Sequence, residues 1–173
     1  HAARRRAVSS NSTRARAVIA QMSARGWRLA LAESCTGGLI SATITGESGA
    51  SCILEASITA YANEAKEALL GAPKQMMIDY GADSAQVALH MAQAARAATM
   101  SDVGLGVTGV AGPGGGTADK PVGRIYLALT SPNGERGAEF NFDGDRDAVR
   151  DQTVAAALEA LLAVADDDPA GSP

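Results

Sequence analysis

Short apolar segments of strand character alternate along this 173-residue chain with segments of helical character, and small residues form the turns between them. Such alternation is typical of a domain in which helices cover both faces of a sheet. The segments that we expect to be strands are 27–32, 53–61, 103–107, 122–130 and 137–142. The segments that we expect to be helices are 12–25, 39–45, 63–70, 84–99 and a last helix that begins near Arg146.

One turn differs from the others. Pro132-Asn133-Gly134 lies between two expected strands and is typical of a β-hairpin, so the two strands should be antiparallel. The pattern predicts an α/β fold, a three-layer sandwich with a mixed, mostly parallel sheet and a C-terminal hairpin. A chain of 173 residues is too short for two independent cores. We therefore expect one domain over 12–165, with disordered tails at 1–11 and 166–173.

The charge balance limits the classes of function. The chain has 15 Lys and Arg against 19 Asp and Glu, which gives a net charge of −4. This balance argues against the basic surface that nucleic-acid binding requires, so we expect no nucleic-acid partner. No apolar run has the length of a membrane span, so we expect a cytoplasmic protein without a membrane partner. Apolar helices rich in small residues favour a homo-oligomer, a dimer being the simplest.

A glycine-rich loop, TGVAGPGGG at 108–116, follows the expected strand 103–107. Backbone N–H groups in such a loop can converge on an anion because no Cβ blocks the approach. This predicts a phosphate or carboxylate site. A plain surface connection explains the composition equally well, although Pro113 favours a stiff loop.

Two nucleotide-binding motifs are excluded. Segment 104–109 satisfies G-x-G-x-x-G, but its first glycines lie within the expected strand and no helix begins at its third glycine. The P-loop pattern fails because Lys120 is followed by Pro121 and not by a hydroxyl residue. The loop thus belongs to neither class of site.

Hydroxyl and lysine side chains are the candidates for chemistry. Ser34 and Ser51 both lie at turns beside expected strands, where either could enter a cleft or act as a turn residue, and spacing does not choose between them. His90 lies within an expected helix, so a Ser–His–Asp triad is excluded and a nucleophilic serine would need lysine or tyrosine. A desolvated lysine can act as a base, whereas arginine cannot. The lysines are Lys66, Lys74 and Lys120.

Residues from about 12 to 165 resemble the CinA C-terminal domain family. The matching segments are AESCTGG at 32–38, GASC at 49–52, YANEAK at 61–66, GADS at 81–84, TGVAGPGGG at 108–116, KPVG at 120–123 and GDR at 144–146. Stand-alone members of this family are nicotinamide mononucleotide deamidases, which produce nicotinate mononucleotide and ammonia. The resemblance implies the same amidohydrolase activity here, with a small mononucleotide as the partner and with no metal or cofactor.

The resemblance also implies roles for individual residues. Ser51 would be the nucleophile and Lys66 its general base, with Tyr61 close to both and Ser34 as a further polar group of the catalytic site. Turn N–H groups, Ser34 or Thr108 would donate to the developing oxyanion. The 5′-phosphate would lie against the glycine loop, with either Arg146 or Lys120 as its charged partner. The residues that would bind substrate are Thr108, Gly109, Gly112, Gly114, Gly115, Gly116, Lys120 and Arg146.

The chain departs from the family pattern at three positions. Ala50 stands where serine is usual, Ser57 where glycine is common, and Asp83 where an apolar residue is usual. The family also includes members without deamidase activity, so a catalytically silent mononucleotide-binding domain is the alternative. A DNA-linked function is a third hypothesis, which the acidic charge balance disfavours.

Overall fold

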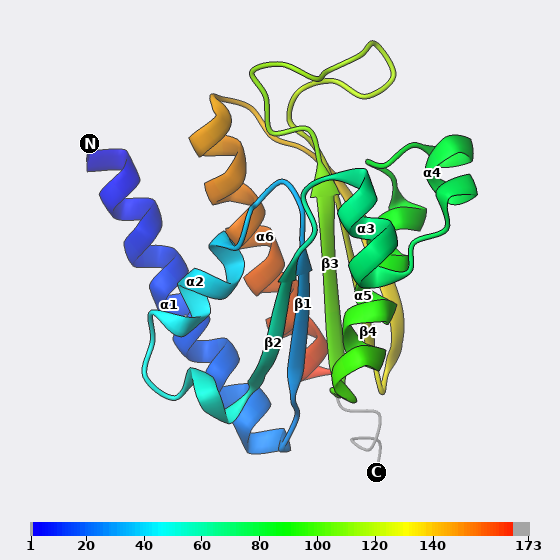
Figure 1. Ribbon diagram of the computed structural model, residues 1–173. Coiled ribbons are helices and arrows are strands. Elements are labelled where there is room, and N and C mark those ends of the chain that lie inside the picture. The colour runs from blue at the N-terminus through cyan, green and yellow to red at the C-terminus, as the bar shows by residue number, and fades with distance from the viewer. Residues whose placement is uncertain (1, 168–173) are drawn as a thin grey trace.

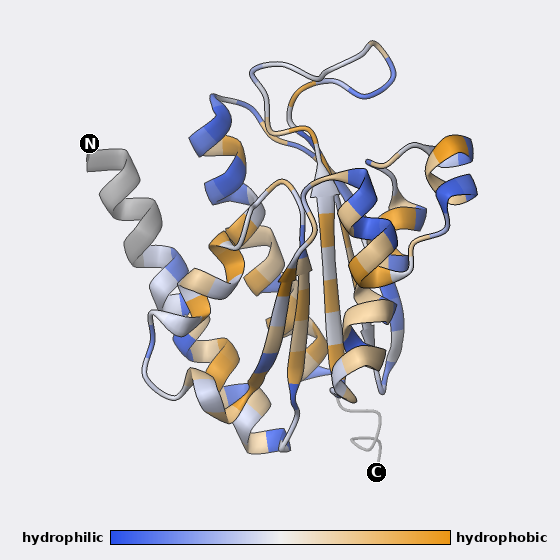
Figure 2. Cartoon of the chain, viewed as in Figure 1, coloured by the Kyte–Doolittle hydropathy of each residue, from blue (hydrophilic) through white to orange (hydrophobic). Residues whose placement is uncertain are grey.

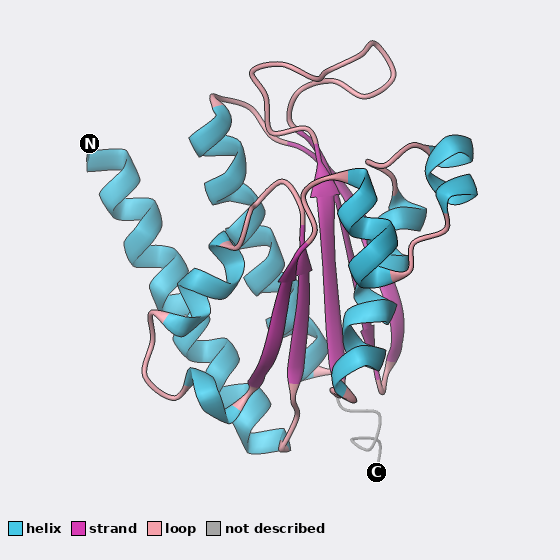
Figure 3. Ribbon diagram, viewed as in Figure 1, coloured by secondary structure: helices cyan, strands magenta, loops and turns pink. Residues whose placement is uncertain are grey.

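The computed structural model describes residues 2–167, with side chains from Ser10 onward, and shows a sheet flanked by helices (Figures 1 and 3). The strands are β1 Leu29–Glu33, β2 Leu54–Thr59, β3 Val103–Gly109, β4 Arg124–Ser131 and β5 Gly134–Asn141. The helices are α1 Ala2–Arg25, α2 Leu39–Thr45, the short 3-10 helix η1 Ala50–Cys52, α3 Asn63–Leu70, α4 Lys74–Tyr80, α5 Ala85–Thr99 and α6 Arg146–Asp166. No helix within residues 2–167 combines the length and the apolar character that crossing a bilayer requires.

The strands form one five-stranded sheet in the order β2-β1-β3-β4-β5. β1 pairs in parallel with both β2 and β3, whereas β4 is antiparallel to both β3 and β5. The mixed sheet and the β4–β5 hairpin confirm the predicted fold class, with the parallel part confined to the first three strands. Gly134 in the hairpin turn has a φ of 104°, a conformation that glycine adopts without steric cost.

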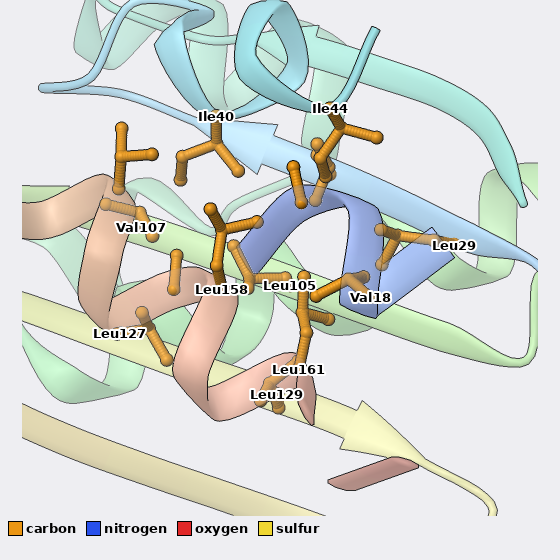
Figure 4. Packing of buried hydrophobic residues seen from close by; sticks show 14 of the residues in the cluster. Val18, Leu29, Ile40, Ile44, Leu105, Val107, Leu127, Leu129, Leu158 and Leu161 are labelled. Carbon is orange, nitrogen blue, oxygen red and sulfur yellow. The ribbon is translucent and has the colours of Figure 1, made fainter. Parts of the chain in front are cut away.

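The sheet lies between two helical layers, as Figure 1 shows. Successive side chains of β1 point to opposite faces. Leu29 and Leu31 belong to the larger core, which they form with α1, α2 and α6 (Figure 4). Ala30 and Ala32 belong to a second core with α3, α4 and α5. In Figure 2 hydrophobic residues run along β1 and β3 and on the helix faces toward them, which is the pattern expected of strands buried on both sides, whereas β2 is half-buried.

Two glycines allow α5 to lie close against β3. A Cβ at Gly106 would be 2.1 Å from the carbonyl oxygen of Ala88, and one at Gly104 would be 2.2 Å from that of Ala92. Such distances are too short for any side chain. The glycines that imitate a dinucleotide-binding motif therefore serve the packing of a helix on a strand, in agreement with the exclusion of that motif.

The structure corrects the sequence analysis at two elements. The prediction of a disordered tail over 1–11 is wrong for 2–11, because α1 begins at Ala2. The Asn11 amide donates to the Asp151 carbonyl oxygen at 3.3 Å and so joins α1 to α6. Helix α4 was not predicted, since its apolar residues Met76, Met77 and Ile78 are consecutive and so show no helical periodicity. At the other end α6 continues to Asp166, and the rest of the predicted tail, 168–173, lies outside the described residues.

The parallel strands bring several turns to one edge of the sheet. Because β1, β2 and β3 run in the same direction, the residues that follow them lie at the same edge. Ser34 follows β1, Tyr61 comes shortly after β2, and the glycine-rich loop follows β3. The first turn of α6 reaches this edge as well (Figure 1). Ligands of α/β proteins commonly bind at the carboxyl ends of the strands.

Candidate active site

A buried carboxylate holds the turn that carries Ser34. Glu33, the last residue of β1, is fully buried. Its oxygens accept hydrogen bonds from Thr36 Oγ1 (2.7 Å), Gly38 N (3.1 Å), Ile40 N (3.0 Å), Ser41 N (2.9 Å) and Ser57 Oγ (3.3 Å). Several of these donors are N–H groups at the start of α2, where the helix dipole favours a negative charge. The carboxylate thus fixes the backbone on both sides of the turn.

The side chain of Lys66 reaches Ser34 from α3. Lys66 is only 2% exposed, and its Nζ donates to Ser34 Oγ at 3.0 Å and to the Tyr61 carbonyl oxygen at 3.5 Å. Burial lowers the pKa of Lys66 below its ordinary value of 10.5, while the nearby Asp83 and Cys35 raise it by smaller amounts. Lys66 therefore loses its proton more readily than a solvated lysine. A neutral amine at this distance can accept the hydroxyl proton of serine.

Arg146 connects two sides of the site. It is the first residue of α6, and its Nη2 donates to the Tyr61 hydroxyl oxygen at 2.7 Å. Its Nη1 donates to the Gly112 carbonyl oxygen, also at 2.7 Å. Tyr61 is 57% exposed, so this connection lies at the solvent side of the site. A guanidinium in this position can bind an anionic group by two parallel hydrogen bonds.

Asp83 brings a carboxylate to the site from the connection between α4 and α5. The buried Thr108 donates through Oγ1 to Asp83 Oδ1 at 2.6 Å, and to the Ala82 carbonyl oxygen at 3.2 Å. Lys120 Nζ donates to the carbonyl oxygens of Tyr80 and Asp83. The connection is thus held from two sides, which orients the Asp83 side chain.

These groups surround a cleft of about 160 Å³. Its lining residues are Ser34, Cys35, Tyr61, Asn63, Lys66, Ala82, Asp83, Gly109, Ala111 and Arg146. Ser34 and Lys66 are buried at its wall, while Tyr61 is exposed at its rim. The cleft can therefore present a reacting group to a serine hydroxyl that is already hydrogen-bonded to a lysine.

Cys35 is the neighbour of Ser34 but is not suited to nucleophilic attack. Burial, with a smaller contribution from Asp83, raises the pKa of the Cys35 thiol to about 12. The thiolate is the nucleophilic form of cysteine, and at neutral pH it is almost absent here. Of the two adjacent side chains, Ser34 is the one that the lysine can activate.

The structure does not bring Ser51 to the site, and the expected pairing of Ser51 with Lys66 is wrong. Ser51 is exposed in η1, before β2, and its carbonyl oxygen accepts a hydrogen bond from Arg28 Nη1 at 3.1 Å. Lys66 lies beyond the other end of β2. A strand of six residues spans about 20 Å, so the two side chains are at opposite edges of the sheet.

The glycine-rich loop is only partly at the site. Gly109 lines the cleft, and the Gly112 carbonyl oxygen accepts from Arg146. The exposed glycines Gly114, Gly115 and Gly116 do not line it. Among the other predicted binding residues, Arg146 lines the cleft, whereas Thr108 and Lys120 hold the Asp83 segment. Phosphate binding by the loop stays a prediction.

Sequence reasoning did not assign a role to three polar residues, Glu33, Asn63 and Asp83. Asp83 carried a signal, because it stands where the family pattern has an apolar residue. Asn63 lies inside the matching segment YANEAK, beside the two residues that were singled out. Glu33 lies next to Ser34 in the segment AESCTGG, but nothing in the sequence indicates that a strand-end glutamate is buried and accepts so many hydrogen bonds.

The fold and the cleft define an α/β domain that carries a buried serine–lysine pair at the carboxyl edge of its parallel strands. Comparison with known families then places it: the model of the CinA C-terminal domain matches residues 11–165. The chain belongs to the CinA C-terminal domain family.

Relatives and solved structures agree with this assignment. A CinA-like protein of Anaeromyxobacter sp. (strain Fw109-5) is 48% identical over 144 residues, which are 83% of this chain and 34% of that protein. A CinA-like protein of Citrifermentans bemidjiense is 53% identical over 137 residues, 79% of this chain and 33% of that protein. The chain thus spans about a third of the length of these relatives.

Solved structures of the same superfamily share the fold. The competence/damage inducible protein CihA from Agrobacterium tumefaciens has a TM-score of 0.86 at 38% identity, with 89% of this chain and 94% of that chain covered. The competence damage-inducible protein A from Klebsiella pneumoniae has a TM-score of 0.87 at 28% identity, with 91% and 99% covered.

Proposed function

We propose that this domain is an amidohydrolase that converts nicotinamide mononucleotide to nicotinate mononucleotide and ammonia. The observation that carries the proposal is the hydrogen bond of 3.0 Å between Lys66 Nζ and Ser34 Oγ, made by a lysine that is only 2% exposed. A buried amine beside a serine hydroxyl is an arrangement that activates a nucleophile without histidine. The resemblance to deamidases of the family supplies the substrate.

In the proposed reaction Ser34 takes the place expected of Ser51. Neutral Lys66 accepts the proton of Ser34 as Oγ bonds to the carboxamide carbon, which gives a tetrahedral intermediate. The Lys66 ammonium then gives that proton to the amide nitrogen, the carbon–nitrogen bond breaks, and ammonia leaves. Water attacks the resulting ester with Lys66 again as the base, and nicotinate mononucleotide leaves as Ser34 regains its proton.

The size of the cleft favours binding of only one part of the substrate inside it. At about 160 Å³ it is smaller than the roughly 300–1,000 Å³ of sites that enclose a whole drug-sized ligand. It suits the carboxamide-bearing ring, with the ribose and phosphate outside, toward the exposed rim. Arg146 at this rim would exchange its bonds to Tyr61 and Gly112 for the phosphate.

The test is ammonia release from nicotinamide mononucleotide by the intact domain and by Ser34→Ala. Ser51→Ala is the matched control, because it removes the same hydroxyl from an exposed position. We expect Ser34→Ala to lower the rate by at least about 10²-fold, since the nucleophile is lost, and Ser51→Ala to leave it nearly unchanged. The reverse pattern would restore Ser51 as the nucleophile.

Absence of ammonia with the intact domain would overturn the proposal. If calorimetry then showed that the domain binds nicotinamide mononucleotide, the result would favour the alternative, a catalytically silent mononucleotide-binding domain. The domain would then bind the mononucleotide in the cleft without hydrolysing it.

A further inference from the structure

The cleft contains an acidic side chain that the proposed reaction does not use. Asp83 lines the cleft, and its Oδ1 accepts a hydrogen bond from Thr108 Oγ1 at 2.6 Å. The second carboxylate oxygen, Oδ2, does not take part in that hydrogen bond. Among the side chains that the structure describes, from Ser10 to Asp167, no basic group forms an ion pair with Asp83 within 4.0 Å. No other lining residue is an aspartate or a glutamate.

Before Lys66 accepts the serine proton, no cationic side chain that lines the cleft pairs with the Asp83 carboxylate, and Lys120, which is not a lining residue, donates to the Asp83 carbonyl oxygen instead. Lys66 must be neutral to act as a base, and Cys35 is a thiol at neutral pH. The Tyr61 hydroxyl accepts a hydrogen bond from Arg146. The guanidinium of Arg146 is itself held by Tyr61 and Gly112. The cleft thus offers one anionic side chain, Asp83, and a separate cationic one, Arg146.

A mononucleotide of nicotinamide has the complementary charges. The ring nitrogen that bonds to the ribose makes the ring a pyridinium cation, whatever the pH, while the phosphate at the other end is an anion. Opposite charges in a partly desolvated cleft attract more strongly than in water. A carboxylate beside the ring and a guanidinium beside the phosphate would therefore orient such a ligand.

We propose that Asp83 determines specificity by binding the cationic pyridinium ring of the substrate and thereby discriminates against neutral aromatic amides. This rests on the proposed function, because it concerns the ligand of that site. Ser34 and Lys66 carry the chemistry, to which Asp83 contributes only by raising the pKa of Lys66, an effect smaller than that of burial. Replacement of its charge should therefore alter KM for a cationic ring more than kcat.

The experiment compares nicotinamide mononucleotide with dihydronicotinamide mononucleotide, which has the same carboxamide, ribose and phosphate but a neutral ring. The variant is Asp83→Asn, whose amide oxygen can still accept the Thr108 hydrogen bond. Asp79→Asn is the matched control, because Asp79 is an exposed acid of α4 that accepts from Gln75. Calorimetry of both ligands gives Kd in a Ser34→Ala background, and ammonia release gives KM and kcat.

We expect Asp83→Asn to weaken binding of the cationic ligand by about tenfold to a hundredfold, the usual range for a lost charged contact. Binding of the neutral ligand should change less than about twofold, and Asp79→Asn should change neither. Equal weakening of both ligands, no weakening, or no binding of the cationic ligand to the Ser34→Ala protein would overturn the proposal. Failure of the proposed function is a separate result, because it appears as absent ammonia release while the calorimetric difference between the ligands persists.

Discussion

Ser34 and Lys66 meet although they are 32 positions apart in the chain. Ser34 stands on the turn after β1, and Lys66 on the helix that follows the neighbouring parallel strand. The end of β1 and the start of α3 therefore lie together, and the long lysine side chain spans the remaining distance. Because the Lys66 side chain is buried, its amine is removed from water where it meets the Ser34 hydroxyl. This loss of hydration lowers the pKa of Lys66.

The pH dependence of ammonia release follows from the titration of Lys66. Its neutral form is the base, so the rate should rise with pH through the Lys66 pKa and level off above it. Because burial lowers that pKa, the rise should be centred below 10.5. The measurement is kcat against pH, with thermal unfolding to confirm that the protein stays folded.

Two substitutions at Lys66 provide the controls for this profile. Lys66→Met should abolish the rise and lower the rate by about 10²–10⁴-fold, the usual contribution of a general base. Lys66→Arg should also abolish the rise and lower the rate, because arginine stays protonated and cannot act as the base. An active Lys66→Arg variant, or a profile that is flat across the alkaline range, would contradict the assignment of Lys66 as the base.

At the scale of elements, the junction of β1 with α2 depends on Glu33. A buried carboxylate at the start of a helix satisfies N–H groups that have no partner within the helix. The same carboxylate accepts from Thr36 and from Ser57 of β2, so it joins the helix, the turn and the edge strand. Ser34 is thereby held on a rigid support, although Glu33 is not itself a cleft-lining residue.

Glu33→Gln should destabilise this junction. The new amide NH₂ would face N–H donors where an acceptor is needed, and the favourable charge at the helix start would be lost. We expect a loss of about 2–4 kcal/mol in the free energy of unfolding, the range for an unsatisfied buried group that had charged hydrogen bonds. Urea denaturation measures it, with Glu67→Gln, a partly exposed glutamate of α3, as the control. Equal stability of the two variants would contradict this account.

At the scale of the whole molecule, the close contact between α5 and β3 sets the distance between the second helical layer and the sheet. That layer carries α3 and the connection with Asp83, so its position determines how close Lys66 and Asp83 come to Ser34. The glycines of β3 permit the contact. The geometry of the cleft is thus coupled to a packing contact that lies outside it.

Gly106→Ala tests this coupling. A methyl group 2.1 Å from the Ala88 carbonyl oxygen and 2.7 Å from the Ala92 nitrogen must push α5 outward, and we expect a loss of about 1–3 kcal/mol in stability. Gly114→Ala is the matched control, since a Cβ there meets nothing within 4 Å. Thermal unfolding compares the two variants. A Gly106→Ala protein as stable as Gly114→Ala would show that the layer can move without cost.

The sequence by itself determined the order and type of nearly all elements, because apolar periodicity and turn chemistry are local properties. It missed α4, whose apolar residues are consecutive and show no helical period, and the start of α1 before Ser12. Family resemblance also selected Lys66, Tyr61 and Arg146, which the structure brings together.

Only the tertiary structure decided which serine Lys66 meets. Ser34 and Ser51 have equivalent local settings, each at a turn beside a strand, but one follows its strand and the other precedes its strand. In a parallel sheet these two positions lie at opposite edges. The burial of Glu33, and the exposure of Gly114, Gly115 and Gly116 outside the cleft, likewise depend on neighbours that are distant in the chain. Local pattern encodes the elements, whereas the sheet order and the packing of the layers determine which side chains share the cleft.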